Sequence, residues 1–190
     1  MGSGYTYPYS QDLLVRRKEI WDNLQKGILF EDQNIFIPWR TKYARITELC
    51  EKRKDSGDRT NWYFGNHKVI DGYECSIEVM KWDWIPWNRP FSNIEVMLGF
   101  DDDGEEKFIF LKKHLTALLG EPTFMKPEEF GKSQIGKYIW INGLTQVHII
   151  GYEQFALKYW LHIGLIQGPK PSIFSRVMGY ILLKIFPNGL

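Results

Sequence analysis

Residues 138–165 read YIWINGLTQVHIIGYEQFALKYWLHIGL, the clearest sheet-forming pattern in the chain. Strand-forming residues stand on both sides of Asn142-Gly143, the dipeptide most typical of a two-residue β-hairpin turn. A turn near residues 151–155 then leads into a last strand over residues 157–165, where apolar and polar residues alternate. The pattern predicts three antiparallel strands in succession, with one face buried against a core.

Upstream of this meander, the chain reads as further strands separated by helices. Asp71-Gly72 signals another hairpin, which leads into a long strand ending near residue 84, and apolar residues alternate again over residues 93–100. The expected helices are residues 10–25 with Ser10 as N-cap, residues 41–50 with Thr41 as N-cap, and residues 105–119 ended by Gly120 and Pro122. Shorter strands are expected at residues 28–30, 34–37, 62–64 and 68–70, and the polar segment 52–61 is expected to be a loop.

This order of elements shows neither a βαβ rhythm nor a repeat. It predicts an α+β fold: a largely antiparallel β-sheet, built as a meander of several strands, with two or three helices packed on one face and an apolar C-terminal helix in addition. We expect a flexible N-terminus over residues 1–9, a single α+β domain over residues 10–166 and a C-terminal apolar helical extension over residues 167–190.

The composition excludes some classes of protein. Hydrophobic residues make up 44% of the 190 residues and aromatic residues 16%, which excludes a disordered chain. The 24 basic and 23 acidic residues nearly cancel, and the basic runs 16–18 and 52–54 have acidic neighbours. We interpret both runs as solvated helix faces and expect no nucleic-acid partner. Two cysteines without a C-x-x-C motif and a start that lacks a secretory pattern predict a cytoplasmic protein with free thiols.

No motif for catalysis, cofactor binding or metal binding stands out. The chain lacks the phosphate-cradling and dinucleotide-binding glycine motifs and the G-x-S-x-G nucleophile motif. The acidic segment 101–106, DDDGEE, does not fit a calcium loop, because positions five and twelve hold Glu105 and Lys112. We therefore expect a turn at its Asp and Gly residues, followed by acidic residues that suit the start of the helix near Glu105. We expect no cofactor, no metal and no catalytic residue that sequence can identify.

Two of the four histidines, His148 and His162, fall on neighbouring expected strands. If the turn between these strands centres on Glu153, His148 faces Lys158, and the two histidines share a face without being directly opposite. A metal or acid–base site formed by His148 and His162 is a minor hypothesis. At His114, on the edge of the apolar stripe of the helix over residues 105–119, we expect a half-buried, hydrogen-bonded histidine.

Residues 81–91 read KWDWIPWNRPF and hold three tryptophans within six positions. Alternation along the strand from Tyr73 places Lys81 on the apolar face, where a charge without partners is costly. We favour a β-bulge near Met80 that turns Trp82 and Trp84 into the core. In the alternative, the strand leaves the core before Lys81, and both rings are exposed.

The exposed alternative has functional consequences, because tryptophan and arginine are enriched in binding hot spots. Arg89 adjoins the cluster, and Trp160, on the polar side of the last strand, could extend it. The candidate binding residues are therefore Trp82, Trp84, Trp87, Arg89 and Trp160.

The C-terminal segment 172–186 is apolar on most sides, and Arg176 and Lys184 are its only charges. A helix of this kind must be covered. We favour docking on its own domain over packing against a partner, including a second copy in a homodimer. A membrane surface is least favoured, because two charges are few for that role. The residues expected to face a partner are Phe174, Met178, Ile181 and Ile185.

Three functions remain open, in decreasing order of support. The first is a non-enzymatic protein-interaction module that acts as an inhibitor, a toxin-neutralising (immunity) protein or an adaptor, with another protein as partner. The second is a small-molecule or lipid-binding domain with an apolar pocket against the sheet. The third is an enzyme whose site combines His148, His162 and acidic loop residues.

Overall fold

The computed structural model describes residues 4–126, 134–153 and 156–166. The expected C-terminal helix, with Phe174, Met178, Ile181 and Ile185, lies outside the described residues. The helices are α1 (Leu13–Leu24), α2 (Tyr43–Leu49) and α3 (Asp101–Leu119). The strands are β1 (Gly27–Phe30), β2 (Ile35–Pro38), β3 (Lys52–Ser56), β4 (Arg59–Val69), β5 (Tyr73–Trp82), β6 (Asn93–Phe100), β7 (Phe124–Lys126), β8 (Gln134–Asn142), β9 (Thr145–Glu153) and β10 (Leu157–Leu165).

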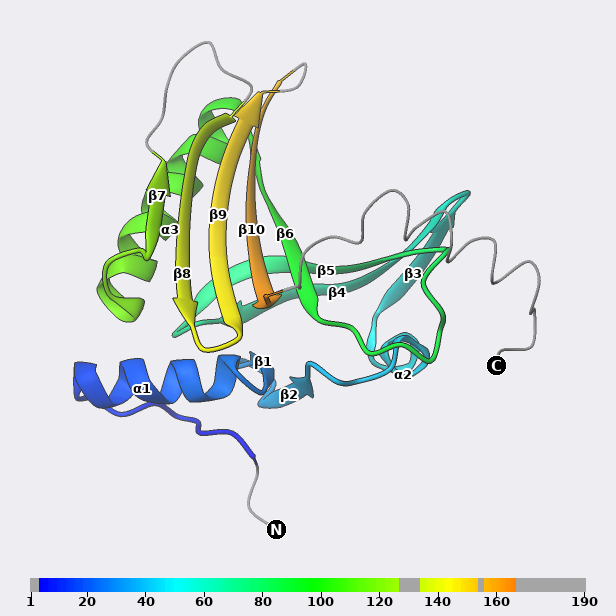
Figure 1. Ribbon diagram of the computed structural model, residues 1–190, viewed down its shortest axis with the longest axis horizontal. Helices are drawn as coiled ribbons and strands as arrows, with labels where there is room; N and C mark the ends of the chain where they lie inside the picture. The colour runs from blue at the N-terminus through cyan, green and yellow to red at the C-terminus, as the bar shows by residue number, and fades with distance from the viewer. Residues whose placement is uncertain (1–3, 127–133, 154–155, 167–190) are drawn as a thin grey trace.

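The main sheet is assembled from two meanders that meet in its middle. Its strand order is β3-β4-β5-β6-β10-β9-β8-β7, and every recorded pair is antiparallel. Strands β3 to β6 follow one another, α3 carries the chain to the far edge, and β7 to β10 return to the centre beside β6 (Figure 1). Strands β1 and β2 form a separate two-stranded sheet near α1. The described residues therefore form an α+β fold with a mostly antiparallel sheet, as the sequence predicts.

One face of the main sheet is buried by the helices, and we call it the core face. Alternate residues of β5, β6, β9 and β10 lie on it, among them Ile77, Val96, Val147 and Leu161, all with at most 1% exposure. Helix α3 packs on β6, β9 and β10, and α1 contacts α3 and β1. The opposite face of the sheet, which we call the outer face, carries the polar half of the alternation.

The helices begin at different residues from those expected. The N-cap of α1 is Asp12 rather than Ser10: its carboxylate accepts the backbone N–H groups of Leu14 and Val15. The Asp and Gly residues of the acidic segment, expected to form a turn, instead lie in the first turn of α3, which begins at Asp101. Three carboxylates in that turn complement the positive end of the helix dipole, and this favours the earlier start.

The expected loop over residues 52–61 is wrong, because this segment is a hairpin of β3 and the start of β4. Gly57, at φ +54°, occupies the turn. The basic run 52–54 therefore lies on an edge strand and not on a helix face. The two short strands expected at residues 62–64 and 68–70 form one strand, β4, with a bulge near Gly65.

Residues near the N-terminus contact the domain. The backbone N–H of Thr6 donates to the side chain of Asn23, whose amide donates back to the Thr6 carbonyl. Tyr9 packs against the core. Among the described residues, no helix has both the length and the apolarity needed to cross a bilayer.

Candidate functional site

The three tryptophans of residues 81–91 form one corner of the molecule, at the end of β5. The register of β5 with β4 is unbroken from Glu78 to Trp82, so the expected bulge near Met80 is wrong. Alternation simply continues, which leaves Lys81 on the core face with 1% exposure. The favoured burial of Trp82 and Trp84 is therefore also wrong, and both rings lie on the surface.

Lys81 is tolerated in the core because its ammonium group has partners. Its Nζ donates to the carbonyls of Trp82, at 3.2 Å, and Ile85, at 3.1 Å. The same nitrogen lies 4.6 Å from the centroid of the Trp87 ring, a cation–π distance. A buried charge with hydrogen bonds of this kind avoids most of the desolvation cost of an unpaired one. Lys81 thus fastens the loop that follows β5 to the end of the sheet.

Backbone hydrogen bonds hold the same loop at two further places. The N–H of Asp83 donates to the carbonyl of Asp58, in the turn between β3 and β4. The carbonyls of Trp87 and Arg89 accept the N–H groups of Ala44 and Tyr43, the first two residues of α2. Helix α2 was expected to be capped by Thr41, but its N-cap residue is Lys42, which makes no side-chain cap bond. The loop carbonyls supply that function instead.

The rings at this corner remain accessible even though their backbone is fixed. Trp82 is 36% exposed, Trp84 61% and Trp87 40%. The Arg59 guanidinium lies 6.0 Å from the Trp82 ring centroid, and that of Arg53 lies 4.7 Å from the Trp87 centroid. We call Trp82, Trp84 and Trp87 the tryptophan corner. Arg89 is exposed beside it.

Trp160 does not extend the tryptophan corner. It lies on the outer face, where β10 places it opposite Met97 of β6 and Ile150 of β9. Glu78, Glu95 and His162 stand opposite one another on β5, β6 and β10. Trp160 lies on the Tyr73 side of Glu78, Glu95 and His162, whereas Trp82 lies on their other side.

The two histidines of β9 and β10 meet directly, which the sequence did not predict. His148 pairs with His162, not with Lys158, and their ring centroids are 4.4 Å apart. Leu157 pairs with Glu153, so the hairpin is centred two residues later than expected. We call Glu78, Glu95, His162 and His148 the histidine row, because they follow one another across four neighbouring strands.

Burial is the main cause of the pKa shifts of His148 and Glu78 in the histidine row. His162 Nδ1 lies 3.5 Å from a carboxylate oxygen of Glu95. Burial, and then the charges of His162 and Lys137, lower the pKa of His148 to about 3, so this imidazole is neutral near pH 7. Burial and the neighbouring Glu95 raise the pKa of Glu78.

Two polar atoms beside this row lack hydrogen-bond partners among the described residues: Nδ1 of His148 and Nε1 of Trp160. The expected half-buried, hydrogen-bonded histidine is found at His114, whose Nε2 lies 2.8 Å from the carbonyl oxygen of Ile70. Within residues 4–126, 134–153 and 156–166, no three histidine, cysteine or acidic side chains are placed to hold a metal ion together.

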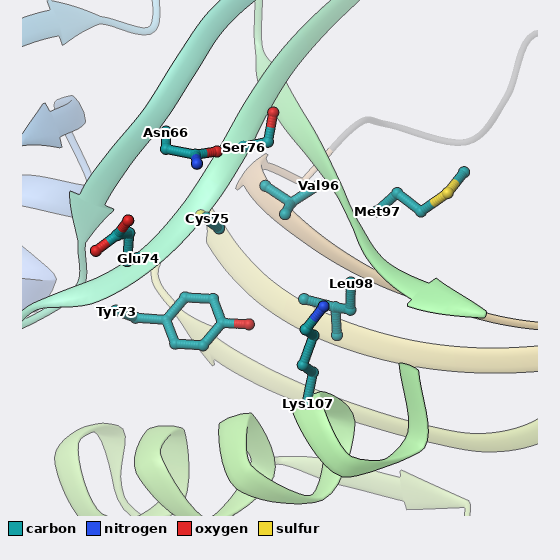
Figure 2. A pocket seen from close by; sticks show the side chains of 9 residues that line it. All are labelled: Asn66, Tyr73, Glu74, Cys75, Ser76, Val96, Met97, Leu98 and Lys107. Carbon is teal, nitrogen blue, oxygen red and sulfur yellow. The ribbon is translucent and has the colours of Figure 1, made fainter. Parts of the chain in front are cut away.

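A cavity lies at the other end of β5, where β5 and β6 separate. The two strands share one residue pair, Glu78 with Glu95, and diverge beyond it. The resulting space has a volume of about 300 Å³ (Figure 2). Its lining residues are Asn66, Tyr73, Glu74, Cys75, Ser76, Val96, Met97, Leu98 and Lys107. The sequence gives no local signal for it, because it depends on the angle between two strands.

No protein-family profile, curated protein or solved structure matches this chain. Among the described residues, the tryptophan corner is the arrangement of exposed side chains whose backbone is most firmly held.

Proposed function

We propose that this protein is a recognition module that binds an acidic segment of another protein at the tryptophan corner. The observation that carries the proposal is the combination of exposed rings and a fixed backbone. Trp84 is 61% exposed, yet Lys81 and the first turn of α2 hold the loop that presents it. An inhibitor, a toxin-neutralising protein or an adaptor would use such a surface.

A fixed loop reduces the entropy cost of association. Ordering a flexible interface side chain costs roughly 0.5–1.5 kcal/mol, and loops that order on binding cost more. Trp87 is already packed edge-on against the buried Trp62, at 5.7 Å between centroids. Indole rings held in this way offer a large contact area, and they lose little conformational entropy when a partner binds.

The charges around the corner favour an acidic partner. The β3–β4 hairpin, residues 52–59, carries four cations and two carboxylates. The carboxylate of Asp55 already forms an ion pair with the guanidinium of Arg53, at 2.9 Å between Oδ2 and Nη2. Arg59, near the Trp82 ring, and Arg89, two residues after Trp87, are both exposed. In an acidic partner segment, a carboxylate can bind a guanidinium while the neighbouring apolar side chain packs on an indole ring. Arginine suits such contacts, because its planar group pairs well with carboxylates.

The test selects short random peptides displayed on phage against the immobilised wild-type protein. We expect the recovered peptides to combine carboxylates with apolar residues and to bind more weakly as salt rises. The Trp84→Ala variant should bind them at least about tenfold more weakly. Its unfolding free energy should change by less than about 0.5 kcal/mol, because the ring is exposed.

Leu14→Ala is the matched control, since Leu14 is 72% exposed on α1 and outside the tryptophan corner. This variant should bind the selected peptides as the wild type does. Recovery of no binding peptide, or equal losses in the Trp84 and Leu14 variants, would contradict the proposal.

A further inference from the structure

The cavity between β5 and β6 is open in the middle of the sheet, where a continuous antiparallel ladder would otherwise leave no space. Its volume of about 300 Å³ is at the lower end of the range for small-molecule sites. It lies at the Tyr73 end of β5, whereas the tryptophan corner lies at the Trp82 end. A ligand here would therefore act independently of the proposed protein recognition.

Two polar groups converge in this cavity from different elements. Tyr73 extends its hydroxyl from the start of β5, and Lys107 extends its ammonium group from α3 toward the same space (Figure 2). The carboxylate of Glu74, in contrast, points away from them in this view. A cation and a phenol that meet in this way offer a carboxylate one charged and one neutral donor.

Lys107 is accessible to a ligand, although it already has an ion-pair partner. Its present partner is Asp103, one helical turn earlier, with Nζ to Oδ2 at 2.7 Å. The two side chains are 51% and 69% exposed, and surface ion pairs of this kind contribute little. An anion in the cavity can therefore share or replace this partner at small cost.

The remaining wall offers apolar contact. Val96 and Leu98 belong to the core, and the buried Cys75 lies between them and β4. Burial, and then the charge of Glu74, raise the pKa of the Cys75 thiol to about 12, so the sulfur is an uncharged part of the wall. Burial also raises the pKa of Tyr73, which keeps its hydroxyl a donor.

We propose that this cavity binds a small carboxylate with a short apolar tail. The carboxylate contacts the ammonium group of Lys107 and the hydroxyl of Tyr73, and the tail lies against Val96 and Leu98. The ligand needs both its negative charge and its apolar tail. A cationic ligand would be repelled by the Lys107 ammonium group, and a carboxylate without a tail would leave the apolar wall uncovered.

The test titrates the full-length protein with octanoate, below its micelle-forming concentration, and follows backbone amide shifts by NMR. We expect saturable shifts confined to β5, β6 and the first half of α3. Octylamine, with the same tail and the opposite charge, and acetate, with the same charge and no tail, should each bind at least about tenfold more weakly.

Lys107→Gln should weaken octanoate binding at least about tenfold, and Tyr73→Phe should weaken it by about threefold. Lys113→Gln is the control, because Lys113 is an exposed lysine of the same helix that does not line the cavity. Equal binding of octylamine, equal losses in the Lys107 and Lys113 variants, or no saturable binding of octanoate would overturn the proposal. None of these outcomes depends on the tryptophan corner.

Discussion

Buried polar groups of this sheet are satisfied differently at Lys81 and at the histidine row. At the tryptophan corner, the Lys81 ammonium group donates to two carbonyls and contacts an aromatic ring. In and beside the histidine row, His148 Nδ1 and Trp160 Nε1 have no hydrogen-bond partner among the described residues.

Burial alone therefore does not indicate what a polar residue does. With partners, a buried cation fixes a loop and the rings on it. Without them, buried polar atoms weaken the fold, and at His148, which can take up a proton, they also make it sensitive to pH.

The largest expected effect is at Lys81. Lys81→Ala should lower the free energy of unfolding by about 3 kcal/mol, because it leaves a cavity and two carbonyls without their donor. Lys81→Met is the matched control: it keeps the apolar stem and should cost roughly half as much. Chemical denaturation of the three proteins measures both values. Equal stability of wild type and Lys81→Ala would show that the ammonium group does not fasten the corner.

A smaller effect is expected at His148 and depends on pH. The pKa of this residue is about 3 in the folded protein, against 6.5 in the unfolded chain, so the unfolded state binds more protons below pH 6.5. Stability should therefore fall as pH falls, and this one group should account for about 2 kcal/mol between pH 7 and pH 5.

The matched variant for this prediction is His148→Phe, which cannot take up the proton. The difference in unfolding free energy between the variant and the wild type should grow in favour of the variant by about 2 kcal/mol from pH 7 to pH 5. The charges of Glu78, Glu95, His162 and Lys137 remain in both proteins. A difference that stays constant over this range would show that His148 is protonated as readily in the folded state as in the unfolded chain.

The smallest expected effect compares two indole N–H groups. Trp62 donates from Nε1 to Thr47 at 2.9 Å beside the corner, whereas Trp160 Nε1 donates to none of the described residues. Trp62→Phe should therefore cost at least about 1 kcal/mol more than Trp160→Phe. Because the two rings also differ in burial, a double-mutant cycle with Thr47→Val isolates the hydrogen bond. A coupling energy near zero would refute the distinction.

Local signals in the sequence were sufficient for much of the fold. Asn142-Gly143 and Asp71-Gly72 mark real hairpins, and Gly120 ends α3 as expected, because turn geometry and helix termination depend on neighbouring residues. The hairpin at residues 52–61 was missed because β3 is an edge strand. Charged residues are common on such edges, where they discourage pairing with other chains, and they conceal the strand pattern.

The candidate site was less predictable, because its contacts join distant segments. The burial of Lys81 follows from strict alternation along β5. Its buried charge is stabilised by the Ile85 carbonyl and the Trp87 ring, which the local sequence pattern does not reveal. Likewise, the contact of His148 with His162 depends on a hairpin register that no turn residue specifies. The placement of Glu95 beside His162 depends on which strands become neighbours, and this too is absent from the local pattern.

Iodide quenching of tryptophan emission, in the wild type and in a Trp82→Phe/Trp84→Phe variant, measures whether the tryptophan corner presents solvent-exposed rings on a fixed backbone. The variant should lose a red-shifted, quenchable component and unfold within about 0.5 kcal/mol of the wild type. Loss of a blue-shifted, protected component, or a loss of several kcal/mol in stability, would place these rings in the core and contradict the account.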